Sequence, residues 1–148
     1  MRVLIIYHSE HHQNTEKIAR TMATKIEAEF KEAKDVTTED INNNDIIGFG
    51  SGVYNGRLHK NLSEIIDKIP YQDNKKSFIF STTGSLSYSR LAHDRFIPLL
   101  IKKGFRIIGE FFCLGFDTAL TREGINKDRP NEQDLEDAER FIESILIK

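Results

Sequence analysis

Val3-Leu4-Ile5-Ile6-Tyr7 is an almost continuous apolar run, and the polar segment Ser9–Thr15, with the sequence SEHHQNT, follows it. A short apolar run of this kind is typical of a buried strand in a parallel sheet. The polar segment leads into Thr15–Phe30, where apolar residues recur at every fourth position from Ile18 onward, as on the inner face of a helix. This unit of strand, turn and helix predicts an α/β fold.

The same alternation continues along the rest of the chain. Further strands are predicted at Ile46–Gly50, Ser77–Ser81 and Phe105–Phe112, with a weak edge strand at Val36-Thr37. Further helices are predicted at Leu58–Ile69, at Arg90–Lys103 and after Asn131, which stands three residues before Asp134 as in a capping box. Alternating strands and helices indicate a parallel sheet covered by helices on both faces, in one domain spanning residues 1–148. In such sheets ligands bind at the carboxyl ends of the strands.

The composition excludes several classes of partner. Lys and Arg number 21 against 23 Asp and Glu, so the sequence lacks the basic excess of a nucleic-acid-binding protein. No apolar run approaches the roughly 18 residues of a membrane span. The chain begins with a strand rather than a signal peptide, which makes the cytoplasm the expected compartment. The single cysteine, Cys113, excludes an internal disulfide and is expected in the core.

The segment after the first strand is a candidate phosphate site. The N-terminus of a helix presents unpaired N–H groups and a partial positive charge, which suit an anion. The candidate binding residues are Ser9, His11, His12, Gln13, Asn14 and Thr15. The segment lacks the Gly-x-x-x-x-Gly-Lys pattern of nucleoside triphosphate sites. A polar surface loop capped by Asn14 is the alternative interpretation. The neighbouring histidines suggest zinc, but no cysteine or carboxylate set completes a site, and no metal is predicted.

Two later loops end at the same predicted edge of the sheet. The first contributes the candidate residues Val53, Tyr54, Asn55 and Gly56, and its Asn-Gly pair is a strong turn signal. The second is rich in Ser and Thr and contributes Thr82, Thr83, Gly84 and Tyr88. Each loop alone could be an ordinary turn. Together with the phosphate candidate, they predict a site for a nucleotide whose planar ring contacts the tyrosines.

These three loops make the chain similar to the flavodoxin family along essentially its whole length. Asn14-Thr15 matches the end of the family's phosphate loop, where Gln13 replaces a glycine. Val53–Gly56 is similar to a turn that contacts the flavin ring, and Gly84–Tyr88 resembles the loop whose tyrosine stacks on that ring. The resemblance implies a three-layer α/β/α sandwich with a five-stranded parallel sheet of order 2-1-3-4-5, and FMN as the cofactor.

The resemblance further implies an electron carrier that shuttles electrons between redox protein partners, which the sequence does not identify. One alternative is an FMN-dependent oxidoreductase that uses NAD(P)H to reduce a quinone or another small acceptor. The other is a flavin-free binding module on the same fold. No catalytic residue is predicted, because His59 and His93 are candidate proton donors by residue type alone and are expected on the surface.

Overall fold

The sheet is built around β1 (Val3–His8), which pairs in parallel with β2 (Glu29–Glu32) on one side and β3 (Ile46–Tyr54) on the other. The computed structural model describes residues 1–10, 12–118 and 123–148. Beyond β3 lie β5 (Lys75–Thr83) and β6 (Phe105–Leu114), which gives the order β2-β1-β3-β5-β6. The predicted order of five parallel strands is confirmed. The short β4 (Arg57–Leu58) is an addition that pairs with the end of β3 in antiparallel fashion.

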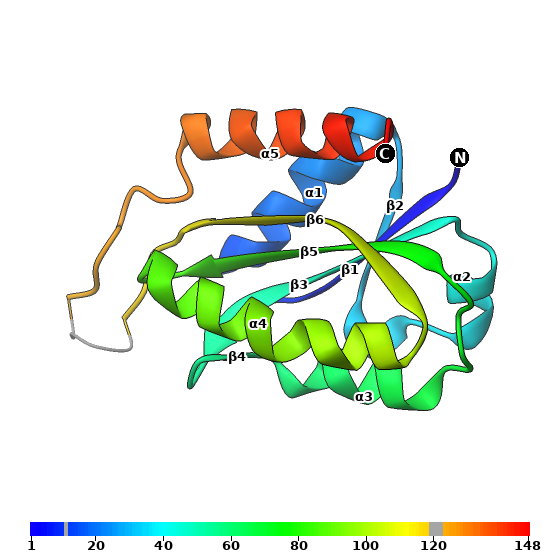
Figure 1. Cartoon of the computed structure of the whole chain (residues 1–148). Helices are drawn as coiled ribbons and strands as arrows, with labels where there is room; N and C mark the ends of the chain where they lie inside the picture. The colour runs from blue at the N-terminus through cyan, green and yellow to red at the C-terminus, as the bar shows by residue number, and fades with distance from the viewer. Residues whose placement is uncertain (11, 119–122) are drawn as a thin grey trace.

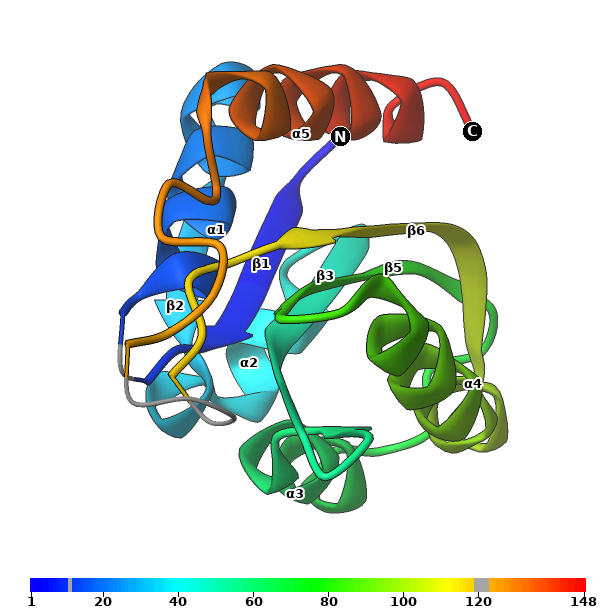
Figure 2. The same ribbon diagram turned by 90° about the vertical axis from the view of Figure 1, so that its left-hand side faces the viewer.

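Helices cover both faces of this sheet, as Figures 1 and 2 show. One face is covered by α1 (Asn14–Ile26) and α5 (Glu132–Ile145). The other face is covered by α3 (Lys60–Lys68) and α4 (Leu86–Lys102). A 3-10 turn (Ala33–Asp35) and the short α2 (Thr38–Asn42) connect β2 to β3. The predicted three-layer α/β/α architecture is therefore confirmed.

The alternation of side chains along the central strand explains why helices are needed on both sides. Ile5 packs into the apolar cluster under α1 and α5, whereas its neighbours Leu4 and Ile6 pack into the cluster under α3 and α4. All three side chains are fully buried. A strand with apolar residues on both faces is stable only when each face is covered, so the VLIIY run itself requires the sandwich.

The first predicted helix ends earlier than its apolar pattern suggests. Glu27 adopts a left-handed conformation with φ 54°, and the Ala28 N–H donates to the Ala23 carbonyl at 2.8 Å, which closes the helix after Ile26. Phe30 was predicted in that helix but lies in β2, where its ring is 5.9 Å from that of Tyr7. The spacing of four between apolar residues therefore extends by coincidence from the helix to Phe30 in the edge strand.

The prediction of an edge strand at Val36-Thr37 is wrong. Thr37 is the N-cap of α2, where its hydroxyl accepts a hydrogen bond from the Asp40 N–H and its own N–H donates to the Asp40 carboxylate. This capping box satisfies two backbone N–H groups that a helix otherwise leaves unpaired. The true edge strand, β2, has the sequence Glu-Phe-Lys-Glu. Its charged side chains are tolerated because an edge strand is partly exposed to solvent.

Three predicted boundaries differ in the structure, because β3, β4 and α4 occupy parts of the candidate loops. β3 continues past Gly50 to Tyr54, and Leu58, predicted as the start of a helix, lies in β4. α4 begins at Leu86 instead of Arg90. At the C-terminus the prediction is confirmed, because Asn131 and Asp134 form a capping box at the start of α5.

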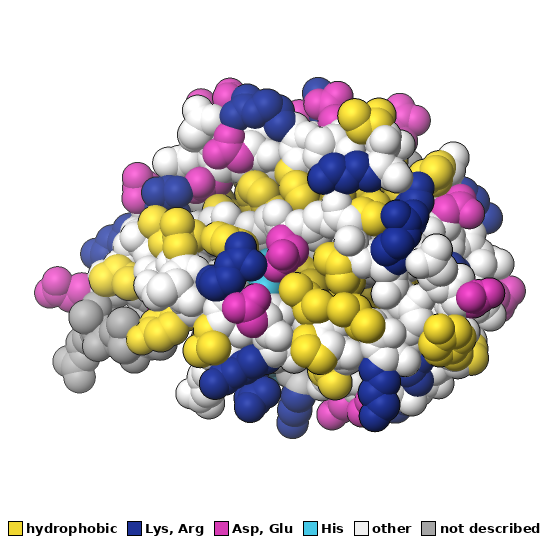
Figure 3. All heavy atoms as spheres, viewed as in Figure 1, with side chains coloured by type: hydrophobic (Ala, Val, Ile, Leu, Met, Phe, Trp, Pro, Cys, Tyr) yellow, Lys and Arg dark blue, Asp and Glu magenta, His cyan; other side chains and the backbone are white. Residues whose placement is uncertain are grey.

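The face that carries α4 exposes several apolar side chains among charged ones (Figure 3). On α4 these include Leu91, Leu99 and Ile101. Scattered apolar side chains are ordinary on protein surfaces and do not by themselves define a site. Within the described parts of the chain, no helix has both the length and the apolar character needed to cross a membrane.

Gly50 provides a test of how tightly the layers pack. A β-carbon at this position would lie within the van der Waals radius of the buried Phe80 ring. We expect Gly50→Ala to lower the free energy of unfolding by about 1–3 kcal/mol, since a close-packed core must shift to admit a methyl group. Gly52→Ala, on the same strand, is the matched control, because the atoms nearest to its β-carbon would be those of the Tyr54 side chain, at 3.3–3.5 Å. Equal urea-denaturation midpoints for the two variants would contradict this account.

Candidate functional site

Loops from four strands meet at the carboxyl edge of the sheet and enclose a cavity of about 320 Å³. This volume lies in the range of small-molecule sites. The loops follow β1, β3, β5 and β6, so they come from widely separated parts of the sequence. The predicted site residues that line the cavity are His12, Asn14, Thr15, Val53, Tyr54, Thr82, Thr83 and Gly84. The sheet edge that topology favours for ligands therefore carries a cavity in this chain.

The other predicted site residues lie around this cavity or outside its lining. Ser9 and Gln13 stand in the turn that leads to α1, Asn55 and Gly56 form the turn between β3 and β4, and Tyr88 is in the first turn of α4. Tyr88 is 51% exposed. His11 lies outside the described residues. Contact between these residues and a ligand stays a prediction.

The start of α1 is open to a ligand. Gln13 precedes the helix as its N-cap in a left-handed conformation with φ 56°, and its own side chain makes no capping hydrogen bond. A non-glycine residue in this conformation is uncommon, and its cost must be offset by the surrounding structure. The Ser9 hydroxyl accepts a hydrogen bond from the Glu16 N–H at 3.3 Å, which leaves its own hydrogen for another acceptor. The first turn therefore offers the donors that an anion requires.

Two hydrogen bonds connect the first turn of α1 to the end of β5 and to the loop after β6. The Thr15 and Thr82 hydroxyls are 2.8 Å apart in a buried contact between α1 and β5. The Asn14 Nδ2 donates to the Phe116 carbonyl at 2.8 Å, which ties α1 to the loop after β6. Because a carbonyl can only accept, this bond also fixes the orientation of the Asn14 amide. These bonds hold the start of α1, the end of β5 and the loop after β6 in one arrangement around the cavity.

The Asn14 amide leaves one acceptor without a partner. Its Oδ1 is buried and has no hydrogen-bond partner within the described part of the chain. A buried acceptor without a partner costs about 1–3 kcal/mol. Phosphate oxygens without hydrogen cannot satisfy it, whereas a hydroxyl or an N–H group can. Asn14, which lies at the candidate anion-binding N-terminus of α1, is thus suited to a ligand that also carries hydroxyl groups.

Tyr54 and the following turn form the wall contributed by β3. Asn55 and Gly56 have φ values of 53° and 72°, as a two-residue hairpin turn with two left-handed residues requires. Arg95 from α4 donates to the Gly56 carbonyl at 3.1 Å and steadies the turn. Burial and the nearby Glu10 carboxylate raise the pKa of Tyr54 to about 12, so its phenol is neutral and can donate a hydrogen bond.

The loop after β6 is a wall of the cavity that the sequence analysis missed. Gly115, Phe116, Asp117 and Thr118 all line the cavity, together with Glu10 and Gly52. The Phe116 ring lies 3.8 Å from that of His12, centroid to centroid. A β-carbon at Gly84 would overlap the Asp117 carboxylate, so glycine allows the loops after β5 and β6 to approach. The sequence contained one signal for this loop: it follows a predicted strand of the parallel sheet, where ligand-binding loops are expected.

His59 lies beside the cavity rather than on the open surface, contrary to the prediction. Its Nε2 is 3.3 Å from the Glu10 Oε1, and its ring stacks on that of His8 at 3.5 Å. The His8 Nε2 is 2.9 Å from the same oxygen. Tyr54 packs edge-on against both imidazoles. The cluster joins segments that are far apart in the sequence, so residue spacing does not reveal it.

His93 was also predicted on the surface, but it is fully buried. Its Nε2 is 2.8 Å from the Ser81 hydroxyl and its Nδ1 is 3.0 Å from the Glu110 carboxylate. A serine, a histidine and a carboxylate in this order can form a nucleophile and its base. Ser81 and Ser89, which share a further hydrogen bond of 2.8 Å, are however 0% exposed. With no access for a substrate, the network serves to join β5, α4 and β6.

The comparisons with known proteins agree with this architecture. A family model described as a flavodoxin domain matches residues 4–98. An uncharacterized protein of Methanocaldococcus jannaschii is 44% identical over 149 residues, with 99% of each chain covered. The chain therefore belongs to the flavodoxin family, which implies a flavin cofactor, typically FMN.

Solved structures show the same fold at low sequence identity. A flavodoxin from the domain Archaea superposes with a TM-score of 0.75 at 15% identity, covering 98% of this chain and 96% of its own. An NADH:FMN oxidoreductase in its apo form superposes with a TM-score of 0.72 at 14% identity, covering 99% and 89%. At these identities the likeness shows the fold alone. It does not separate carriers from enzymes.

The buried His93 predicts how stability depends on pH. Burial lowers the pKa of His93 below its ordinary value of 6.5, although Glu110 opposes the shift. As the pH falls below about 6.5, the unfolded chain binds a proton that the folded chain resists, and the free energy of unfolding decreases. We expect His93→Gln, which cannot take up the proton, to be less stable than the unmodified protein at neutral pH. Between pH 6.5 and the lower pKa of His93 in the folded protein, the variant should lose less stability than the unmodified protein. Parallel curves for the two proteins in urea denaturation over this window would contradict the assignment.

Proposed function

We propose that this chain binds FMN in the cavity and carries electrons between redox proteins. The observation that carries the proposal is the open N-terminus of α1, which faces a cavity whose wall holds the unpartnered Asn14 Oδ1. An anion seat next to a site for a hydroxyl group fits the phosphate and the ribityl chain of FMN. Membership of the flavodoxin family supports the same cofactor.

The residues around the cavity divide into groups according to the part of FMN that they suit. The N–H groups of the first turn of α1, with the Ser9 and Thr15 hydroxyls, would hold the phosphate. Hydrogen bonds to a charged group contribute about 1.5–3 kcal/mol each, so several of them suffice without Lys or Arg. Tyr54 and Phe116, which contribute aromatic rings to the described lining, would contact the flavin ring. When bound, FMN would supply one- and two-electron redox chemistry that no side chain of this chain provides.

Asn14 has two roles in this proposal. Its amide nitrogen donates to the Phe116 carbonyl, which positions the loop after β6. Its buried oxygen would accept a hydrogen bond from a ribityl hydroxyl, which removes the cost of an unsatisfied acceptor. The same side chain thereby couples ligand binding to the position of the loop after β6.

A flavin-dependent reductase on this fold is the second candidate. The cluster of His8, Glu10 and His59 beside the cavity favours it, because these groups can exchange protons with solvent. The carrier remains the leading proposal because the described lining holds no histidine other than His12, whose ring packs against Phe116 and approaches the Thr118 hydroxyl.

The cofactor assignment is tested by titrating the purified protein with FMN and measuring the quenching of flavin fluorescence. We expect Thr15→Val to bind FMN about ten- to a hundred-fold more weakly than the unmodified chain, as expected for losing a hydrogen bond to a charged group. Thr24→Val is the matched control, because it makes the same change at an exposed position of the same helix. Absence of FMN binding by the unmodified chain would overturn the proposal. Equal affinities for the two variants would show that the phosphate is held elsewhere.

Carrier and reductase are separated by following NADH and NADPH oxidation with a small benzoquinone as acceptor. We expect the FMN-loaded protein to oxidise either nicotinamide no faster than free FMN at the same concentration. Saturable turnover that exceeds free FMN would favour the reductase and contradict the carrier.

A further inference from the structure

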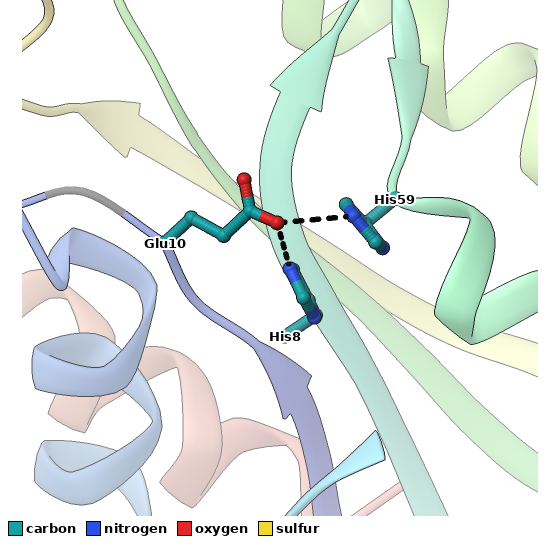
Figure 4. A group of neighbouring side chains, drawn as sticks. All are labelled: His8, Glu10 and His59. Atoms are coloured by element: carbon teal, nitrogen blue, oxygen red, sulfur yellow. Dashed lines mark hydrogen bonds and ion pairs between the residues drawn. The ribbon is translucent and has the colours of Figure 1, made fainter. Parts of the chain in front are cut away.

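His8, Glu10 and His59 form a compact cluster beside the cavity (Figure 4). Both imidazole Nε2 atoms face the same carboxylate oxygen, at 2.9 Å from His8 and 3.3 Å from His59. Glu10 also lines the cavity, so the charge of the cluster is felt inside it. Three such side chains at this spacing have the composition of a metal site, with ligand atoms within 4.8 Å of one another. Their hydrogen bonds indicate a different role.

Asn61 determines where the protons of both imidazoles lie. Its backbone N–H donates to the His59 Nδ1 at 3.1 Å, which makes His59 the N-cap of α3. Its side-chain Nδ2 is 3.1 Å from the His8 Nδ1 and donates to it in this arrangement. An imidazole whose Nδ1 accepts a hydrogen bond carries its proton on Nε2 when neutral. Both histidines therefore donate Nε2–H groups to Glu10.

This tautomer is the wrong one for metal binding. A histidine that binds a metal through Nε2 needs a lone pair on that atom and a proton on Nδ1. The Asn61 N–H prevents that arrangement at His59 unless the cap of α3 is lost. The two rings are also stacked at 3.5 Å with planes only 14° apart, so one ion cannot lie near the plane of both rings. The geometry thus favours proton exchange over metal coordination.

The two histidines differ in their capacity to take up a proton. A proton on the His59 Nδ1 would face the Asn61 backbone N–H, and this N–H cannot reorient while α3 is formed. A proton on the His8 Nδ1 would face the Asn61 side-chain amide, which can rotate to present its oxygen as an acceptor. Burial, with a contribution from His8, lowers the pKa of His59, in agreement with a neutral ring. His8 is the member of the pair that can be charged without loss of the helix cap.

The charges around His8 come from several elements. Glu10, in the loop after β1, faces its Nε2, while His59 and Lys60 stand at the start of α3. Tyr54, at the end of β3, packs edge-on and is neutral. Protonated His8 would donate to Glu10 and to the Asn61 oxygen, so both of its N–H groups would have acceptors. Negative charge that arrives in the cavity would favour the protonated ring by Coulomb attraction.

We propose that His8 takes up a proton from solvent when negative charge enters the cavity, while His59 stays neutral and holds the cap of α3. This inference rests on the proposed function, in which the arriving charge is the electron delivered to FMN by a redox donor. The proton moves from the buffer to the His8 Nδ1, and no bond to the cofactor forms or breaks. Proton uptake would offset part of the charge that electron transfer brings into the cavity.

The first test uses the flavin-free protein and two-dimensional ¹H–¹⁵N NMR of the imidazole nitrogens between pH 5 and 8. We expect both rings to be Nε2–H tautomers at pH 8, and His8 to become protonated before His59 as the pH falls. Asn61→Asp, which keeps the backbone N–H but offers a carboxylate to the His8 Nδ1, should move the His8 transition to higher pH. Protonation of His59 first, or an Nδ1–H tautomer on either ring at pH 8, would overturn the proposal. So would stoichiometric Zn²⁺ binding that shifts both rings.

The second test measures proton uptake on reduction of the FMN-loaded protein, from the dependence of the midpoint potential on pH. His8→Gln keeps an N–H donor toward Glu10 but cannot be protonated, so we expect it to take up about one proton fewer than the unmodified protein. His59→Asn keeps an acceptor for the cap and should behave like the unmodified protein. Normal FMN binding with unchanged proton uptake in His8→Gln would overturn this inference alone. Failure of the unmodified protein to bind FMN would overturn the proposed function and this inference together.

Discussion

The buried hydrogen bond between the Thr15 and Thr82 hydroxyls, 2.8 Å long, holds the site together. It joins the first turn of α1 to the end of β5, two segments that are 67 residues apart in the sequence. The bond from Asn14 to the Phe116 carbonyl extends the same connection to the loop after β6. Because both contacts start from consecutive residues of one helical turn, the N-terminus of α1 and two walls of the cavity are directly linked to one another. The remaining wall, around Tyr54, is attached through β3.

Neutral donors dominate the lining of this cavity. Its residues within the described parts of the chain include the carboxylates Glu10 and Asp117 but no Lys or Arg. An anion would therefore be held by backbone N–H groups and hydroxyls, whose hydrogen bonds are directional and depend on the fold being intact. The two carboxylates add negative charge near the site, which disfavours further negative charge in the cavity. Proton uptake at His8 would act against this repulsion.

The sequence was informative wherever local pattern and burial agree. The VLIIY run and the later apolar strands predicted a parallel sheet covered on both faces, because such a sheet buries apolar residues on both sides. The strand order was implied by the resemblance to flavodoxins rather than by these local patterns. The edge strand β2 was missed because a half-exposed edge accepts Glu and Lys, which carry no strand signal. The end of α1 was missed because Glu27 adopts a left-handed conformation that glycine or asparagine would have marked.

The lining of the cavity was predictable in part. Lining residues in the loops after β1, β3 and β5 were singled out because those loops follow recognisable strands and carry unusual residues, and their contact with a ligand stays a prediction. The loop after β6 was overlooked, although it ends at the same sheet edge. The pairing of His8 with His59 and the burial of His93 depend on contacts between segments far apart in the chain. Such contacts are set by the packing of β1 against α3 and of α4 against β6, which residue spacing alone does not contain.

A crystal structure of the chain grown with FMN tests the central claim most directly. The account predicts phosphate oxygens within hydrogen-bond distance of the first-turn N–H groups of α1, a ribityl hydroxyl on the Asn14 Oδ1, and the ring beside Tyr54. A phosphate in solvent, or a flavin bound away from the loops that follow β1 and β5, would contradict it.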